Sequence, residues 1–379
     1  MFARLGARIA FLAIDARTER TRHQVNYPET YNAIFTRLKH ELSDAASDGQ
    51  PIKHLILLLG IPIAYPVSSA SLPRAQTPTI PYVLTAQRLT WLENIFSSPL
   101  MGPIKLLNRR VGFGGSFFNS FDGSVDLLDD LDDHYTARTH KKERNWLIEK
   151  LQTVCAEFSV RITILSGDVH LAALGRFYSH PRLKVPVEED FRYIVNVVSS
   201  AIVNKPPPAA VANLLAHRNK IHHLNHDTSE TLLKLFDRDP GESQKTAAHN
   251  NVTMPSRNFA VITENRPATT NGHHHDHHHD HHHDNPDDFH PPKDGRLPLS
   301  RGENHCGTAH KAADPATHGR AADGGLDVCI CVETDQRDAR GRTEGYGLTI
   351  PALDYRGPRM ASLEILPPRS AGSRGSART

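Results

Sequence analysis

The sequence predicts an α/β fold built on a largely parallel sheet. Three runs of continuous apolar residues, at 54–60, 160–165 and 193–198, predict strands that are covered on both faces. Apolar residues at helical spacing predict helices over 31–42 and 141–157. Strands that alternate with helices and lack a polar face are typical of a parallel-rich sheet.

The N-terminal part begins with a predicted buried strand over 8–15, which ends in a charged loop. Gly49-Gln50-Pro51 ends the first helix before the strand at 54–60. Residues 61–81 then form a long, Pro-rich loop, a kind of segment that often carries function. We expect a helix over 88–107 and irregular, Gly- and Phe-rich chain over 112–123.

The C-terminal part is interrupted by a biased segment. Pro206-Pro207-Pro208 opens a helical or loop region that runs to about residue 240. A triple His-His-His-Asp repeat, His273 to Asp284, lies in a segment with few large apolar residues, which predicts disorder. Order returns in two predicted strands at 326–333 and 345–351. The predicted organisation is a domain over 1–265, a disordered insert over 266–324, the final strands of the same domain over 325–353, and a disordered tail over 354–379.

Charge and cysteine content limit the class of protein. The chain carries 44 basic and 42 acidic residues, a balance that favours neither nucleic acid nor a membrane surface as a partner. Its four cysteines form no C-x-x-C pair, so a zinc ribbon has no support. We expect a reduced intracellular setting for them. The apolar runs at 9–14 and 55–65 are too short for a secretory signal and a membrane span. We therefore expect a soluble, cytoplasmic protein, with its oligomeric state and peripheral membrane association left open.

The strongest local motif is Ser166-Gly167-Asp168-Val169-His170, at the end of a predicted buried strand. Asp168 and His170 are two positions apart, so in extended backbone their side chains point the same way. A carboxylate and an imidazole suit a divalent or trivalent metal ion. The alternative is a turn in which Asp168 caps a helix that begins with Leu171-Ala172-Ala173-Leu174.

Two further segments carry candidate residues. His134 follows a run of aspartates, and a histidine near a metal pair could bind phosphate or donate a proton to a leaving group. A solvated, acidic helix N-terminus is the alternative for that run. Arg17 and Arg20 follow Asp15 at the end of a strand, where arginine suits phosphate recognition. An internal Asp–Arg ion pair is the alternative there.

Taken together and in this order, the motifs resemble those of the PhoD-like phosphatases, in particular their fungal branch. The order along the chain is D-x-R-x-x-R, G-I-P-I-A-Y-P, D-D-H-Y followed by H-K-K-E-R, and L-S-G-D-V-H. The resemblance covers 8–265 and 325–353. It implies a metallophosphatase-like β-sandwich flanked by helices, and phosphoester hydrolysis at a bimetal centre with Fe, Ca, Mn or Zn. It also implies that Asp168 and His170 are metal ligands, and that Arg17 and Arg20 belong to the family's arginine motif.

The sequence departs from the family at its N-terminus. A metallophosphatase assembles its metals mainly from motifs that precede Asp15, so the fold is expected to be incomplete there and the chain weakly active or inactive alone. Asn225-His226-Asp227 contains an Asn-His pair like the one that supplies metal ligands in metallophosphatases, but we interpret it as a helix N-cap. The His-rich repeat is expected to bind zinc, nickel or copper adventitiously. The alternatives to a phosphoesterase are a non-catalytic binding or regulatory protein and a fragment of an incomplete gene model, so whether the chain is an enzyme stays open.

Overall fold

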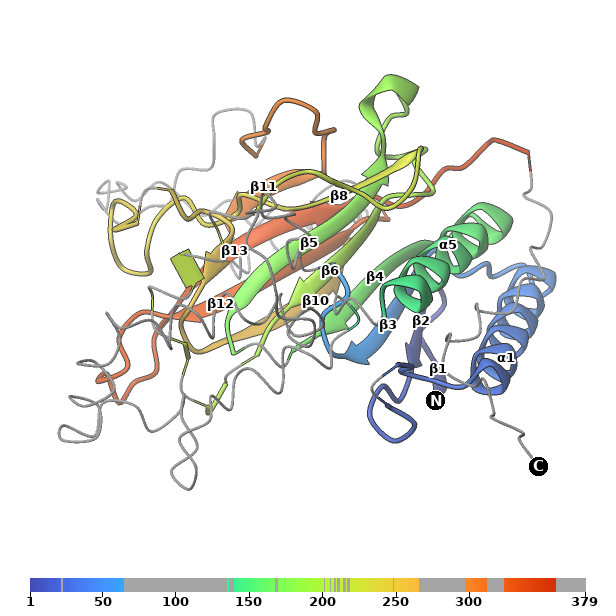
Figure 1. Cartoon of the computed structure of the whole chain (residues 1–379), viewed down its shortest axis with the longest axis horizontal. Helices are drawn as coiled ribbons and strands as arrows, with labels where there is room; N and C mark the ends of the chain where they lie inside the picture. Colours follow the sequence, from blue (N-terminus) through green and yellow to red (C-terminus); the bar gives the residue numbers. More distant parts are fainter. Residues whose placement is uncertain are drawn as a thin grey trace, which may run out of the picture.

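The fold is described from a computed structural model of the chain (Figure 1). The structure describes residues 1–21, 23–64, 135, 140–167, 170–200, 202–204, 206–207, 209, 212–213, 216, 219–247, 249–265, 297–311 and 324–358. The predicted helix at 88–107, the irregular segment at 112–123 and most of the 61–81 loop lie outside them.

The larger sheet combines a parallel centre with antiparallel flanks. Its strands are β1 (Phe2–Leu5), β2 (Ile9–Ala13), β3 (His54–Gly60), β4 (Arg161–Ser166), β5 (Ala172–Ser179), β6 (Ile194–Val198), β7 (His222–His223), β8 (Thr228–Leu232) and β9 (Thr253–Met254). They are arranged in the order β1-β2-β3-β4-β6-β5-β8-β7, and β9 also pairs with β5. Strands β2, β3, β4 and β6 are parallel, so their carboxyl ends meet at one edge of the sheet.

The smaller sheet is antiparallel throughout its described part, in the order β10-β12-β13-β11. Its strands are β10 (Asn258–Glu264), β11 (Thr308–Lys311), β12 (Leu326–Glu333) and β13 (Thr343–Ile350). Strand β10 pairs with β12 from Asn258↔Val332 to Glu264↔Leu326. The sheet therefore joins chain from both sides of the His-rich segment, while the predicted domain boundaries stay a prediction.

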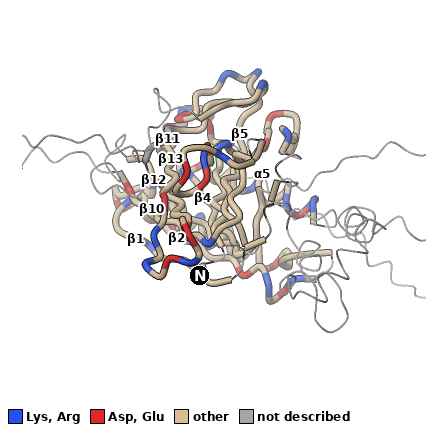
Figure 2. Tube along the Cα trace, turned by 90° about the vertical axis from the view of Figure 1, so that its left-hand side faces the viewer, with Lys and Arg blue, Asp and Glu red and all other residues tan. Residues whose placement is uncertain are grey.

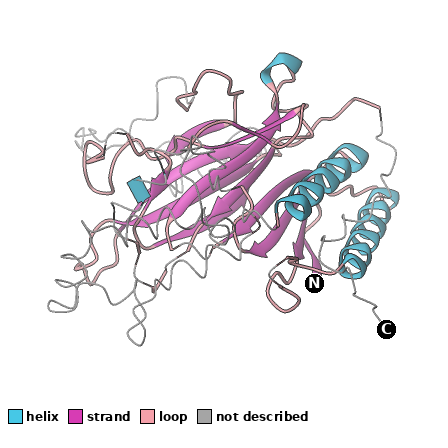
Figure 3. Ribbon diagram, in the orientation of Figure 1, coloured by secondary structure: helices cyan, strands magenta, loops and turns pink. Residues whose placement is uncertain are grey.

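The two faces of the larger sheet are covered differently (Figures 1 and 3). Helices α1 (Pro28–Ser47) and α5 (Lys141–Phe158) share one apolar core with alternate residues of β2, β3 and β4. Trp146 of α5 lies between the rings of Tyr31 and Phe35 of α1, with centroids 5.1 and 5.9 Å away. On the other side, residues of β5 and β6 share a second core with β12 and β13. The described fold is thus a sheet-dominated α/β arrangement of two sheets and a helix layer.

The structure confirms the predicted strands that became β2, β3, β4, β6, β12 and β13, and the predicted helices at 31–42 and 141–157. One alternative and one interpretation were wrong. The stretch from Ala172 is strand β5, so the alternative in which a helix begins with Leu171 does not hold. Residues 228–232 are strand β8, so the Asn225 turn precedes a strand instead of a helix. No helix in the described residues is long and apolar enough to cross a membrane.

Candidate active site

The candidate site is the edge where the parallel strands end, and its centre is the end of β4. The Gly167 N–H donates to the carbonyl of Gly60, with N and O 3.0 Å apart. The Ser199 N–H donates to the carbonyl of Ser166 at 2.9 Å. A β-carbon added to Gly167 would lie 3.2 Å from Cβ of Ser200, which is tighter than most side-chain contacts. The ends of β3, β4 and β6 are therefore held together, and Gly167 allows their close approach.

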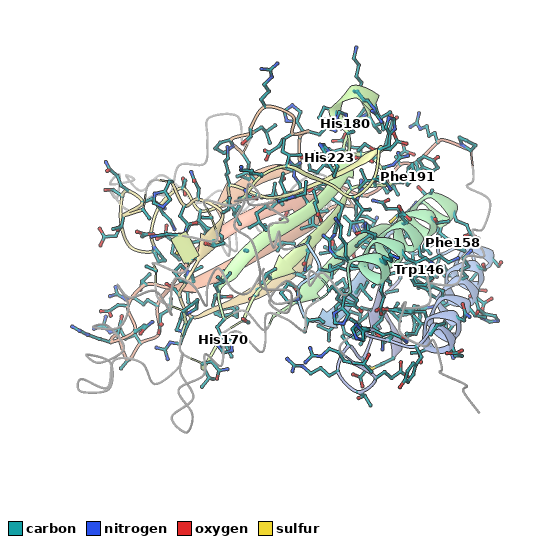
Figure 4. The ribbon with its side chains drawn as sticks, viewed as in Figure 1. Trp146, Phe158, His170, His180, Phe191 and His223 are labelled. Atoms are coloured by element: carbon teal, nitrogen blue, oxygen red, sulfur yellow. The ribbon has the colours of Figure 1, made fainter. Side chains whose placement is uncertain are left out.

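His170 lies directly beyond this point. Its backbone has a φ of +52°, a left-handed conformation that is uncommon for a residue with a side chain. Its Nε2 lies 3.2 Å from Nδ2 of Asn204 in the loop after β6. Figure 4 places His170 on the opposite side of the sheet from His180 and His223. Asp168 lies outside the described residues, so its predicted pairing with His170 stays a prediction.

The loop after β2 carries the predicted arginines. Oδ1 of Asp15 accepts hydrogen bonds from the backbone N–H groups of Arg17 and Thr18, at 2.8 and 2.9 Å. The Thr18 hydroxyl and these N–H groups lower the pKa of Asp15 to about 2. Arg17 is exposed and Arg20 half-buried. The Asp15 carboxylate therefore organises the backbone of the arginine motif, which is a role the sequence alone did not reveal.

A residue at the N-terminus of α5 also holds the loop after β2 in place through hydrogen bonds. Glu143 is buried, and its carboxylate accepts the N–H groups of Val25 at 2.8 Å and Asn26 at 3.0 Å. The Tyr31 hydroxyl donates to Oε1 of Glu143 at 2.7 Å, and the hydroxyl of Tyr135 lies 3.3 Å from that of Tyr31. Burial raises the pKa of Tyr31, which keeps this donor protonated. The predicted residue His134 lies outside the described residues.

A second buried network positions the start of the loop after β3. Oδ1 of Asn196 accepts the N–H groups of Ile63 and Ala64, each at 3.1 Å. Nε of Arg144 donates to the Ile63 carbonyl at 2.7 Å, and its guanidinium pairs with Glu230. These roles were missed from the sequence. The available signal was one amide, Asn196, in the middle of the apolar run Ile194–Val198.

Asn225-His226-Asp227 lies away from the candidate site. Oδ1 of Asn225 accepts the N–H groups of Asp227 at 3.0 Å and Thr228 at 2.9 Å. The turn therefore joins β7 to β8, where Thr228 pairs with Ser179 at the end of β5. Because β5 runs antiparallel to β6, this turn lies at the amino ends of the parallel strands. The helix N-cap interpretation was wrong, although the amide does cap a turn.

The described residues do not by themselves form a metal centre. Within the described ranges, no group of three or more His, Cys, Asp or Glu side chains is arranged to hold a metal ion. The candidate edge supplies the His170 imidazole and the Asn204 amide. Acidic and basic residues are interspersed along the described trace, without a region of one sign (Figure 2). The charges of the described part of the chain therefore do not select a ligand class.

Comparison with known proteins shows which family this chain resembles. The family model of the PhoD related phosphatases matches residues 101–289, a range that includes β4 and the Ser166-to-His170 motif. The chain is also 42% identical over 255 residues to the uncharacterized protein YGR266W of Saccharomyces cerevisiae. That match covers 63% of this chain and 33% of the yeast protein, so the chain spans about a third of its relative. No solved structure matches. The match to the family model, together with the motif at the end of β4, supports an assignment of this chain to the PhoD-related phosphatases.

Proposed function

We propose that the chain carries part of a metal-dependent phosphoester hydrolase, with its site at the carboxyl edge of β2, β3, β4 and β6. The observation that carries the proposal is the position of the Ser166-to-His170 motif, at the end of a central parallel strand in a chain that matches a phosphatase family. Ligand sites of parallel α/β sheets lie outside the carboxyl ends of the strands.

In this proposal each candidate residue has one role. Asp168 and His170 bind metal, and Arg17 and Arg20 bind the phosphoryl oxygens of a phosphoester substrate. His134 donates a proton to the leaving group. A bound metal ion, whether Fe, Ca, Mn or Zn, would polarise the phosphoryl oxygen and lower the pKa of a bound water.

The described networks support this proposal by holding the loops in place. Glu143 and Tyr31 hold the chain just beyond the arginine motif, while Asn196 and Arg144 hold the loop after β3. These four groups are buried, so water competes little for their hydrogen bonds. We assign them positioning roles, because loops of defined geometry are what catalysis by orientation requires.

A non-catalytic binding or regulatory role is the second candidate. The observation that favours it is the distance of 3.2 Å between Nδ2 of Asn204 and Nε2 of His170, which gives a protein partner to a nitrogen that the first candidate assigns to a metal. Both candidates predict a folded domain. They differ in whether metal and phosphoester turnover depend on Asp168 and His170.

Metal content and turnover of purified variants test the proposal. We expect Asp168→Ala and His170→Ala to lose metal that the parent chain retains after dialysis, without a change in circular dichroism. Asp227→Ala is the matched control, since it removes an exposed aspartate next to a histidine at the other end of the sheet. The His-rich segment is the same in all variants, so the difference in metal content reports the motif.

Turnover is then measured on a generic phosphoester with added manganese, iron or calcium. We expect metal-dependent hydrolysis that is slow compared with the roughly 10 s⁻¹ of a median enzyme and that is absent from Asp168→Ala. Unchanged metal content in both motif variants, together with no hydrolysis by the parent chain, would favour the binding role. Hydrolysis at ordinary enzyme rates would overturn the expectation of weak activity and strengthen the assignment as a phosphatase.

A further inference from the structure

The smaller sheet carries a pair of thiols on the face turned away from the larger sheet. Residues Leu326, Val328, Ile330 and Val332 of β12 belong to the core between the sheets. Cys329 and Cys331 alternate with them and therefore lie on the outer face. Their Sγ atoms are 3.3 Å apart, and both residues are almost fully buried. The two sulfur atoms thus form one compact cluster of their own.

The two neighbouring strands place different residues beside the thiols. Cys329 pairs with Gly347 of β13, and Cys331 pairs with Gly345, so these two positions contribute no side chain beside the sulfurs. On the other flank the paired residues are Val261 and Phe259 of β10, which are 38% and 40% exposed. The thiols are therefore flanked by bare backbone on one side and by a half-exposed apolar pair on the other.

The other two cysteines of the chain, Cys155 and Cys306, have no second thiol beside them. Cys155 packs in the core beneath the helices and Cys306 in the core between the sheets, and each lies among apolar neighbours without a second thiol in its cluster. In the pair, by contrast, hydrogen bonds from Cys329 and from the Thr343 side chain lower the pKa of Cys331. A thiol that donates to a neighbouring sulfur is a precursor of a chelating dithiolate, and a bound cation completes the deprotonation.

We propose that Cys329 and Cys331 form a two-thiolate binding site for a soft metal ion of the Cu(I) class. Thiolate is the soft ligand that selects Cu(I), and two ligands satisfy this ion. Zinc normally requires four ligands, and within the described ranges no three-ligand group exists at this or any other position. The 3.3 Å between the sulfurs is shorter than the roughly 4.6 Å that two collinear metal–sulfur bonds of about 2.3 Å span. Binding therefore requires rotation of the two side chains, which moves the sulfurs apart toward the near-linear arrangement of two-coordinate Cu(I).

Burial of the two sulfurs favours a stable metal site, and it also means that the metal ion can enter only when the sheet opens locally. A sheet face that excludes water shields the thiolates from oxidation and keeps a bound soft ion from exchanging. Entry requires a local opening, and we expect β10 to open because it is an edge strand of the described sheet and pairs directly with β12. Binding releases up to two protons, so Cu(I) affinity is expected to increase with pH.

The test is an anaerobic Cu(I) titration of the full chain against a chromogenic Cu(I) chelator. We expect one tightly held Cu(I) per chain that is lost in the Cys329→Ser/Cys331→Ser double variant. Cys155→Ser and Cys306→Ser are the matched controls and should retain it. X-ray absorption of the loaded parent chain should show a copper coordinated by sulfur alone. The His-rich segment is common to all variants and is outcompeted by the chelator.

A second measurement on the parent chain keeps the proposal testable if the double variant fails to fold. Loaded and unloaded protein are alkylated in the folded state, and the ratio of modification between the two is quantified for each cysteine by mass spectrometry. Cu(I) should protect Cys329 and Cys331 at least tenfold more than Cys155 and Cys306, whereas Zn²⁺ should not. Equal alkylation of all four cysteines, or copper bound through nitrogen, would overturn the proposal.

Discussion

Asn196 is a single residue on which the geometry of the candidate edge depends. Its side-chain oxygen accepts two backbone N–H groups from the loop after β3, and its amide nitrogen donates to Oγ of Ser166 at 2.8 Å. The residue is fully buried, so water cannot replace these partners. One amide in this way connects the ends of β3, β4 and β6.

We predict that Asn196→Ala destabilises the protein by about 2–4 kcal/mol, because it leaves buried N–H groups without an acceptor. Urea unfolding followed by circular dichroism measures the change. Asn225→Ala is the control, since Asn225 also accepts two backbone N–H groups but lies in an exposed turn where water can substitute. A loss of less than about 1 kcal/mol is expected there, and equal losses in both variants would contradict the role of burial.

Gly175 permits another close approach, between strand β5 and the loop after β3. A β-carbon at this position of β5 would lie 2.0 Å from the carbonyl oxygen of Ala64, so either the strand or the loop would have to move. We predict that Gly175→Ala lowers stability by roughly 1–3 kcal/mol or more. At Gly167 the added carbon would meet the Ser200 side chain at 3.2 Å. Gly167→Ala should therefore cost less, and thermal unfolding of the two variants would reveal a reversed order if the argument is wrong.

At the scale of elements, strand β3 begins with a buried histidine. Nε2 of His54 lies 2.6 Å from the carbonyl oxygen of Gly324, and Nδ1 has no hydrogen-bond partner among the described residues. Burial lowers the pKa of His54 to about 4. Protonation of Nδ1 would place a charged donor in the core without an acceptor, so the folded protein holds this ring neutral.

This histidine makes stability depend on pH in a predictable direction. In the unfolded chain His54 binds a proton near pH 6.5, whereas in the folded chain it does so only near pH 4. The stabilisation is complete above pH 6.5 and is lost as the pH falls toward 4, up to about 3 kcal/mol. His54→Gln should flatten the dependence of unfolding free energy on pH in this window. His40→Gln, on the exposed side of α1, should leave it unchanged.

The elements also show where sequence reasoning succeeds. Strands β4 and β6 are predicted from their own residues because the helices cover one face and the second sheet covers the other. Strand β3 is equally apolar in sequence, but its Leu58 is 38% exposed. The stretch Leu171-Ala172-Ala173-Leu174 has no such signature. Its residues favour helix intrinsically, and only pairing of β5 with β6 and β8 makes it a strand.

The site was predicted in part for the same reason. The motif at the end of β4 was visible because it follows a strand directly in sequence. The contact of Glu143 with the backbone of Val25 joins residues 118 positions apart, and no local pattern encodes it. Asn196 could have been noticed as an amide in an apolar strand, but its partners at Ile63 and Ala64 could not have been named. Long-range polar contacts are decided by the fold and become visible only with it.

At the scale of the whole molecule, one buried arginine connects the two sheets with the chain that follows them. The guanidinium of Arg161 in β4 donates to the carbonyls of Val187, Asp190 and Tyr193 before β6, and to that of Pro351 after β13. Its charge is satisfied by backbone dipoles and by stacking over the Tyr193 ring at 5.0 Å. The last strand of the second sheet is therefore tied directly to the centre of the first.

The pairing of the sheets also predicts that the His-rich repeat is dispensable for folding. Strands β10 and β12 pair from Asn258↔Val332 to Glu264↔Leu326, and the described chain between them adds β11 to the same sheet. These contacts involve no residue of the repeat. Deletion of 273–284 shortens that connection and changes its closure entropy by only about 0.5 kcal/mol. We predict an unfolding free energy within about 1 kcal/mol of the parent and loss of nickel retention on a chelating column.

The control replaces each histidine of the repeat with serine and keeps the length, so it should lose nickel retention with no change in stability. A deletion that unfolds the protein while the serine variant stays folded would mean that the segment contributes structure of its own.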